Sequence, residues 1–478
     1  MHDTPAPDDV VRSDHGGHHV SDVPLVDRVL APFRRFTQTE SASGLVLLAA
    51  TAIALGWANS PWAASYHHLW ELPVGGALGG MSFQTTLHHL INDGLMAVFF
   101  FVVGLEIKRE VLAGELASVR TAALPMIGAL GGMVVPAAIY AAINVGGPGA
   151  PGWGVPMATD IAFALGVLAL LGDRVPIGLK VFLAALAIVD DIGAVLVIAL
   201  FYSSGIVWGA LAAAAALLLF AVGLNRAGAR RPWTYGAVGL ALWATVLLSG
   251  IHATVAGVLL AFAIPVRTRV NEQQFLTRAR RALDDFDAAA AVTASDPATT
   301  VLSNAGHHAA VEEIEMLCEH AQPTLIRLEH ALHGIVSFGI MPVFALANAG
   351  VTLDATALRD AVLSPVTLGA AAGLLIGKPL GIVGFSWLGV RFGVAVLPKG
   401  STWLALAGVG VLGGIGFTMA LFIAGLAFPP GSSRSGVLDA AKLGVLAASA
   451  GAGIVGSLVL RRALLRPGID PTATPHVD

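Results

Sequence analysis

Long apolar runs dominate the sequence between residues 42 and 460. Each run covers about twenty residues, which is the length that a helix needs to cross the hydrocarbon core of a bilayer. Strands of a membrane barrel would alternate apolar and polar residues, whereas runs such as 211–224 are apolar on every face. The pattern therefore predicts an all-α integral membrane protein. We expect about twelve transmembrane helices, at residues 42–60, 86–107, 122–145, 151–171, 176–201, 204–223, 233–250, 251–265, 325–350, 364–390, 402–428 and 437–460.

The composition agrees with this interpretation. Hydrophobic residues make up 56% of the chain and charged residues only 12%, a balance that is rare in soluble proteins. The single cysteine, Cys318, excludes an intrachain disulfide and any metal or redox motif built on several cysteines. The first forty residues lack the basic start, short apolar core and cleavage site of a signal peptide, so we expect the first span to be retained.

The basic residues predict which side of the membrane each loop faces. Arg34 and Arg35 precede the first span and indicate a cytoplasmic N-terminus. With that start, only Arg359 and Arg434 fall in outer loops, whereas nearly all other basic residues outside the spans lie on the inner side. An even number of spans then places both termini in the cytoplasm.

Three segments are not expected to cross the membrane. In the N-terminal tail, His15, His18 and His19 could bind a metal, although a solvated tail without an assigned function is the simpler interpretation. Residues 61–85 form a Gly-rich outer loop with a possible short hairpin, which has either no role or a subunit contact in a homodimer. The third segment is an insert of unknown purpose with an acidic, helix-like stretch at 307–320. The predicted organisation is a polar cytoplasmic tail at 1–38, spans at 39–266, a cytoplasmic insert at 267–324, spans at 325–462 and a cytoplasmic tail at 463–478.

Four ionisable residues lie near the middle of apolar spans. Asp190 and Asp191 are adjacent in the fifth span, Asp160 lies in the fourth and Lys378 in the tenth, all at similar depths. A charge at the centre of a bilayer costs about 2.5–3.5 kcal/mol even on insertion-based scales, so each residue needs a reason to be there. These four residues are therefore the candidates for ion handling.

The adjacent aspartates have the chemistry of an exchange site. Two carboxylates this close in a poorly solvated site cannot both be ionised cheaply, so at least one is expected to hold a proton near neutral pH. Carboxylate oxygens suit a hard cation such as Na⁺, which they would release on protonation. Competition between Na⁺ and protons for Asp190 and Asp191 would by itself produce exchange, and the proton losses of the two groups should be coupled.

Lys378 has two open roles, which do not exclude each other. It could be the counter-charge of the aspartates, or it could itself carry a proton, because desolvation favours the neutral amine. Gly377 before it and Pro379 after it loosen the helix and free a nearby backbone carbonyl. The alternative is a buried Asp–Lys pair that only specifies helix packing.

Two spans contain sequences that form helix poorly. The fourth opens with PGWGVPMATD and becomes good helix only after Asp160, so a helix is expected to start at mid-membrane, with Thr159 or Asp160 capping its free N–H groups. The eleventh contains the glycine-rich GVGVLGGIGFTMA. Interrupted spans in two halves point to a transporter site built from inverted repeats. The glycines of the eleventh span could instead only permit close helix packing.

Seven motifs, in this order, resemble the NhaA family of sodium/proton antiporters: INDGLMAVFFFVVGLEIKRE, ATDIAFALGVLALLG, ALAIVDDIGA, SGIHATVAGV, ANAGV, LLIGKPLG and GIGFTMALFIA. The resemblance covers about residues 42–266 and 325–462. NhaA transporters are among the proteins from which the rule on interrupted spans was drawn, so the agreement with that rule is not independent. The long tail and the insert depart from the family pattern.

The resemblance implies a role for each candidate. Asp191 would bind the cation, Asp190 would join it in proton exchange and pair with Lys378, and Thr159 and Asp160 would sit where two discontinuous helices, in spans 4 and 11, cross at mid-membrane. The protein would export Na⁺, and also Li⁺, from bacteria across the plasma (inner) membrane as protons enter. About two protons per sodium would make transport electrogenic. No ATP motif is present, so this secondary transporter of intracellular pH and sodium homeostasis would need no cofactor beyond the transported ions.

The family also implies a cytoplasmic funnel that responds to pH. Two of its candidates, His330 and His333, are three residues apart on one helix face and titrate near neutrality when unperturbed. Charges at inner ends of spans are, however, also expected from snorkelling and orientation alone. His252 and Asp93 lie in matching motifs with weaker individual arguments. The full set of pH-sensing candidates is Glu106, Arg109, Glu110, Glu329, His330 and His333.

Three other classes of function share some of these features. A cation channel would also bury acids, but its proton flux need not depend on sodium. An intramembrane enzyme would need a nucleophile–base pair or an HExxH metal motif, which we do not find in the sequence. A membrane scaffold would use the charges only to specify assembly, which four central ionisable residues disfavour. No nucleic-acid partner is expected.

Overall fold

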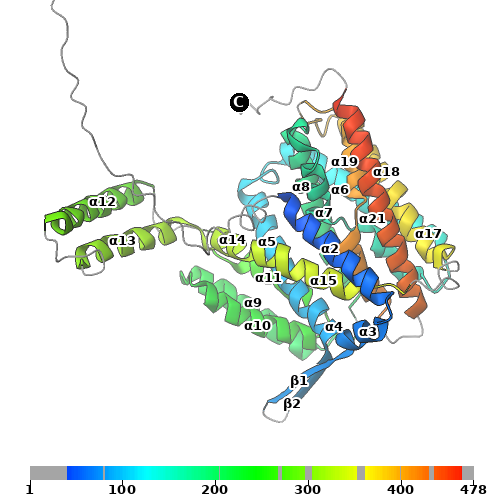
Figure 1. Cartoon of the computed structure of the whole chain (residues 1–478), viewed down its shortest axis with the longest axis horizontal. Helices are drawn as coiled ribbons and strands as arrows, with labels where there is room; N and C mark the ends of the chain where they lie inside the picture. Colours follow the sequence, from blue (N-terminus) through cyan, green and yellow to red (C-terminus); the bar gives the residue numbers. More distant parts are fainter. Residues whose placement is uncertain are drawn as a thin grey trace, which may run out of the picture. The chain divides into compact units, whose positions relative to one another are not determined.

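The computed structural model describes eight stretches of the chain (Figure 1). The N-terminal tail with its three histidines lies outside the described residues, as do Arg359, Arg434 and the last thirteen positions of the C-terminal tail. The described stretches are 40–78, 81–203, 205–266, 272–295, 304–352, 361–398, 400–429 and 435–465.

Helices make up most of the described chain, as the apolar runs predict. Many of the spans are built from two or three pieces, because short π-helical or 3₁₀ turns (η) interrupt the α-helical hydrogen bonding. In chain order the elements are α2 (Glu40–Ala58), α3 (Ala63–Glu71), β1 (Pro73–Leu78), β2 (Met81–Thr86), α4 (Leu87–Leu90), η1 (Ile91–Leu95), α5 (Met96–Ala113), α6 (Val119–Ile143), η2 (Ala150–Met157), α7 (Ile161–Ala169), η3 (Gly172–Arg174), α8 (Ile177–Phe201), α9 (Trp208–Arg226), α10 (Pro232–Leu248), α11 (Thr254–Ala263), α12 (Glu272–Ser295), α13 (Ala305–Ala321), α14 (Thr324–Ile335), η4 (Val336–Ile340), α15 (Met341–Asn348), α17 (Pro365–Ala372), η5 (Gly373–Gly377), α18 (Lys378–Arg391), α19 (Trp403–Gly413), α20 (Phe417–Ala427) and α21 (Ser435–Leu464).

The expected multi-span helical membrane protein is confirmed. Within the described residues, eight helical stretches are long and apolar enough to cross a membrane, and the number is ten if each of two bent helix pairs crosses once. These pairs are α2 with α3, bent by 112°, and α19 with α20, bent by 44°. The other two predicted spans correspond to α10 and α11, which have only 17 and 10 residues. The total of twelve therefore stays a prediction.

The segment 61–85 contains more structure than a loop. Strands β1 and β2 pair as an antiparallel hairpin, which confirms the possible hairpin, but helix α3 was not anticipated. The Tyr66 hydroxyl of α3 donates to the carbonyl of Leu346 at 2.8 Å, near the end of α15. Carbonyl groups in the last turn of a helix have no hydrogen-bond partner within that helix. This hydrogen bond therefore stabilises both α3 and α15.

The insert forms two helices that pack on each other, of which only α13 was anticipated. Ala282 and Ala289 of α12 and Leu317 of α13 are buried in the contact. The rings of Phe286 and His307 contact each other at a tilt of 36°, with centroids 4.0 Å apart. On α12, Ala282, Phe286 and Ala289 are separated by four and three residues, which places them on one helix face. The insert therefore has a small apolar core of its own.

Helices α6 and α18 pack backbone to backbone beside the candidate site. A Cβ atom on Gly131 of α6 would overlap the carbonyl oxygen of Gly381, and a Cβ atom on Gly381 would overlap that of Gly131. The two glycines therefore allow an approach that no larger residue permits. Gly381 lies one turn after Lys378, so this contact fixes the position of Lys378 against α6.

Gly381→Val is expected to destabilise the protein by about 3 kcal/mol, at the upper end of the usual cost of overpacking, because the clash is with rigid backbone rather than with a movable side chain. Gly384→Val is the matched control, since a Cβ atom at Gly384 of the same helix would meet nothing within 4 Å. Thermal unfolding of the two variants in detergent measures the difference. Equal Tm values would show that the α6–α18 contact is not as close as described.

Candidate functional site

Two interruptions of helix contact each other at the centre of the site. After η2 ends at Met157, residues 158–160 are extended, and α7 begins at Ile161. Helix α19 ends at Gly413, and α20 begins at Phe417. The backbone N–H of Asp160 donates to the carbonyl of Ile415 at 2.7 Å, so the two breaks are joined directly.

The glycines of the second break permit this approach. A Cβ atom on Gly416 would lie 3.0 Å from the carbonyl oxygen of Ala158, and one on Gly414 would overlap the carbonyl oxygen of Leu374. Close packing, which was the alternative explanation for the glycine run, is therefore real. It does not compete with a functional role, because the packing itself brings the breaks together.

Asp160 caps two helices at once. One carboxylate oxygen, Oδ1, accepts from the Phe163 N–H of α7 at 3.0 Å. The other, Oδ2, accepts from the Thr418 N–H of α20 at 3.1 Å and from the Thr418 hydroxyl. Both helices point the positive ends of their dipoles at this buried carboxylate, which offsets part of the cost of its charge. With both oxygens occupied, Asp160 is suited to organising the site rather than to binding an ion.

Asp190 and Lys378 form a fully buried ion pair. Asp190 lies on α8, and its Oδ2 accepts from the Lys378 ammonium group and from the Thr159 hydroxyl, the latter at 2.7 Å. The ammonium group also donates to the carbonyl of Met157, at the end of η2. Lys378 reaches this position as the first residue of α18, directly after the π-helical turn η5, in the sequence where Gly377 and Pro379 weaken the helix.

Asp191 lacks both the ion pair of Asp190 and the helix-capping hydrogen bonds of Asp160 among the described residues. Its side chain is 1% exposed, and its Oδ1 has no hydrogen-bond partner among the described residues. Asp190, one position earlier, points about 100° away around α8. Its Oδ1 also lacks a partner among the described residues, but its Oδ2 accepts from Lys378 and Thr159, whereas no such ion pair is found there for Asp191. A buried carboxylate without donors is costly, and a proton or a bound cation would satisfy it. Asp191 is thus the carboxylate most suited to bind an ion.

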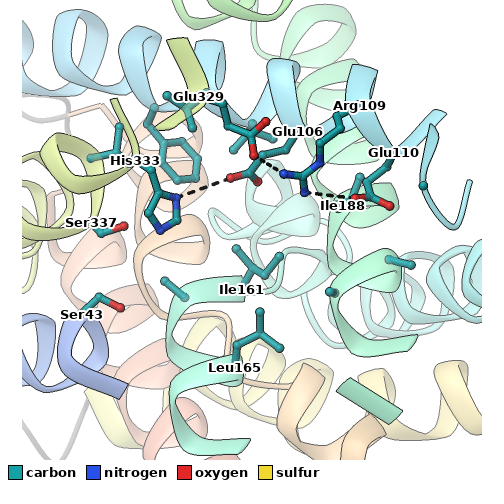
Figure 2. Close-up of a pocket in the computed structure, with 18 of the residues that line it drawn as sticks. Ser43, Glu106, Arg109, Glu110, Ile161, Leu165, Ile188, Glu329, His333 and Ser337 are labelled. Atoms are coloured by element: carbon teal, nitrogen blue, oxygen red, sulfur yellow. Dashed lines mark hydrogen bonds and ion pairs between the residues drawn. The ribbon is translucent and has the colours of Figure 1, made fainter. Parts of the chain in front are cut away.

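A cavity of about 630 Å³ lies beside this group (Figure 2). Its apolar wall includes Ile161, at the start of α7, and Ile188, one turn before Asp191. Glu106 lines the same cavity and interacts electrostatically with Asp191. The cavity therefore provides an approach for cations to within about one helical turn of the buried aspartate.

Five of the six pH-sensing candidates line this cavity. Figure 2 shows them together on the wall opposite Leu165, where the carboxylate of Glu329 forms an ion pair with Arg109. Arg109 also contacts Glu110 at 3.1 Å, and His333 Nδ1 lies 3.9 Å from Glu106. His330, although three residues from His333, is exposed and does not line the cavity.

The two weaker candidates also meet. His252 Nδ1, in the turn before α11, lies 3.9 Å from the Asp93 carboxylate on η1. The Trp243 indole donates to the backbone carbonyl of Asp93 at 3.0 Å. Neither His252 nor Asp93 lines the cavity, so the structure separates this pair from the five charges above.

Sequence reasoning did not select two residues of the site. Thr418 stands in the GIGFTMA motif, and its position directly after a glycine-rich break could have identified it as a helix-start residue. Ser449 lies in an ordinary apolar stretch of α21, and no local signal marks it. Its role is visible only from its contact with α20.

Comparison with known proteins agrees with these motifs. The chain matches the model of the family described as Na⁺/H⁺ antiporter 1 over residues 34–460. It is 52% identical to the Na(+)/H(+) antiporter NhaA of Oleidesulfovibrio alaskensis, with 92% of this chain and 96% of the relative covered. It is 49% identical to Na(+)/H(+) antiporter NhaA 2 of Syntrophotalea carbinolica, covering 91% and 97%, and to the NhaA of Koribacter versatilis, covering 94% and 96%. The chain therefore belongs to the Na⁺/H⁺ antiporter 1 family, the family of the NhaA antiporters.

Proposed function

We propose that this protein exchanges Na⁺ for protons across the bacterial plasma membrane, with Asp191 as the main ion ligand. One observation carries the proposal: Asp191 is buried in an apolar helix, where an ionised carboxylate is costly, and its Oδ1 has no partner within the described part of the chain, whereas the carboxylate of Asp190 is paired with Lys378. The names of the relatives, Na(+)/H(+) antiporter NhaA and NhaA 2, support the same assignment.

The proposed cycle is a competition for one site. Na⁺, the transported substrate, binds the ionised Asp191 and leaves when protons bind. Asp190 and Lys378 form a second proton-binding unit, because a proton added to Asp190 weakens the ion pair and frees the ammonium group. One proton at each unit would give about two protons per sodium, and thus electrogenic transport. Li⁺, which is smaller but has the same charge, should bind the same oxygens.

Access to the site would alternate between the two sides of the membrane. The contact between the two interrupted spans, η2–α7 and α19–α20, supports a crossing of discontinuous helices. We place this crossing at mid-membrane, in a fold of twelve spans built from inverted repeats. A gradient of one ion would then drive the other, as in a secondary active transporter. We place both termini in the cytoplasm, as the distribution of the basic residues along the sequence favours.

The charged wall of the cavity is the proposed pH-responsive element. When His333 gains a proton, its attraction to Glu106 increases, which draws α14 toward α5 at the mouth of the cavity. The Arg109–Glu329 pair joins the same two helices. We exclude His330 from this element because it does not reach the cavity.

The hairpin in segment 61–85 is the proposed contact of a homodimer. An isolated two-stranded hairpin is only marginally stable in water, so β1 and β2 would gain stability from pairing with a second copy. Lipids and the transported ions would be the other partners.

Purified protein in liposomes with an acid interior tests the function. Addition of NaCl or LiCl outside should collapse the proton gradient reported by an interior pH dye, whereas KCl should not. Opposite imposed membrane potentials should change the rate if transport is electrogenic. Proton leakage without Na⁺ would indicate a channel, and an equal response to KCl would show that the ion assignment is wrong.

A further inference from the structure

The N-terminus of α20 is capped from outside its own sequence. The residue before it, Gly416, has no side chain to act as a cap. Instead, the N–H of Phe417 donates to the Ser449 hydroxyl oxygen at 3.1 Å, and the N–H of Thr418 donates to Asp160 at 3.1 Å. The first hydrogen bond inside the helix runs from Ala420 to Gly416 at 2.8 Å. Two of the free N–H groups at this helix end thus depend on distant side chains.

Ser449 lies where one helix supports both halves of the site. It is 6% exposed on α21, which runs beside α19 and α17 (Figure 1). Two residues later, a Cβ atom on Gly451 would lie 3.2 Å from the side chain of Leu375 in η5, the turn that leads into Lys378. A single turn of α21 therefore contacts both the start of α20 and the turn before Lys378.

We propose that Ser449 is a positioning residue for ion exchange. Its hydroxyl group holds the first turn of α20, so that Thr418 meets Asp160. Asp160 in turn follows Thr159, whose hydroxyl donates to Asp190. Without the Ser449 hydroxyl, the buried N–H of Phe417 loses its partner and this turn can shift or fray. The proposal rests on the exchange function, and it concerns the affinity for Na⁺ rather than the proton chemistry.

Sodium-dependent proton movement in liposomes tests this role with three variants. Ser449→Ala is expected to raise the half-maximal Na⁺ concentration about tenfold, the effect of losing roughly one buried hydrogen bond, with little change in maximal rate. Ser449→Thr keeps the hydroxyl group and should restore the wild-type value. Ser457→Ala is the matched control, because that hydroxyl lies on the same helix but donates to its own backbone, at Gly453, and should leave the value unchanged.

A wild-type half-maximal concentration in Ser449→Ala, or an equal increase in Ser449→Thr, would overturn the proposal. So would a lower Tm and maximal rate with an unchanged half-maximal concentration, which is the result of a purely structural role. Absence of Na⁺-dependent proton movement in the wild-type protein would overturn both this inference and the proposed function. Wild-type exchange with an unaltered Ser449→Ala overturns this inference alone.

Discussion

Asp191→Asn is expected to reduce Na⁺-dependent proton movement to below about one hundredth of the wild-type rate. The amide has nearly the same shape as the carboxylate, but it neither carries a charge to attract Na⁺ nor binds and releases a proton in the working pH range. The same substitution should leave the fold intact, because Oδ1 of Asp191 has no partner to lose among the described residues. Stopped-flow measurement of the pH dye in liposomes gives the rate.

Thermal unfolding of the purified variant provides the control. The Tm of Asp191→Asn should equal or exceed that of the wild type, since a buried charge has been removed. Asp160→Asn should instead lower the Tm, because an NH₂ group would then face the N–H of Phe163 or Thr418. Full exchange by folded Asp191→Asn would show that another group binds the ion.

The positions of the four charges along their spans predicted a common site, but only the resemblance to NhaA implied that Asp190 pairs with Lys378. A helix rises by about 1.5 Å per residue, so the place of Asp160, Asp190, Asp191 and Lys378 along their spans indicated that they lie at one level. Adjacent Asp190 and Asp191 look alike in the sequence. They differ because α18, packed on α6, brings Lys378 to Oδ2 of Asp190, whereas Asp191 has no such ion pair among the described residues. That distinction depends on contacts between distant spans, which helical periodicity does not contain.

Contacts between elements also decide which of the two histidines lines the cavity. A spacing of three correctly predicted that His330 and His333 lie on one side of α14, but the edge of the cavity passes between them because of how α14 packs on α5.

The sequence analysis did not predict helix α12, although its pattern is visible in the sequence: Phe275, Ala282 and Ala289 recur every seven residues. Its many alanines and aspartates make this apolar face less distinct in the sequence than one built from larger side chains.

Lys378→Met is expected to destabilise the protein by about 3–5 kcal/mol, because it leaves Asp190 as a buried charge without its counter-ion. The unbranched methionine fills similar space, so little of this loss comes from a cavity. The double variant Asp190→Asn/Lys378→Met should recover most of the stability, since both charges are then absent. Equilibrium unfolding in mixed micelles measures the free energy of unfolding of the single and double variants.

The double variant also separates two explanations of the pair. If Asp190 and Lys378 only specify helix packing, the restored fold should exchange Na⁺ for protons at the wild-type stoichiometry. If the pair is the second proton-binding unit, the double variant should move fewer protons per sodium, because only Asp191 still titrates. The Na⁺ and pH gradients at which net flux reverses report this ratio. An unchanged ratio in a stable double variant would assign the pair to folding and leave proton exchange to Asp191 alone.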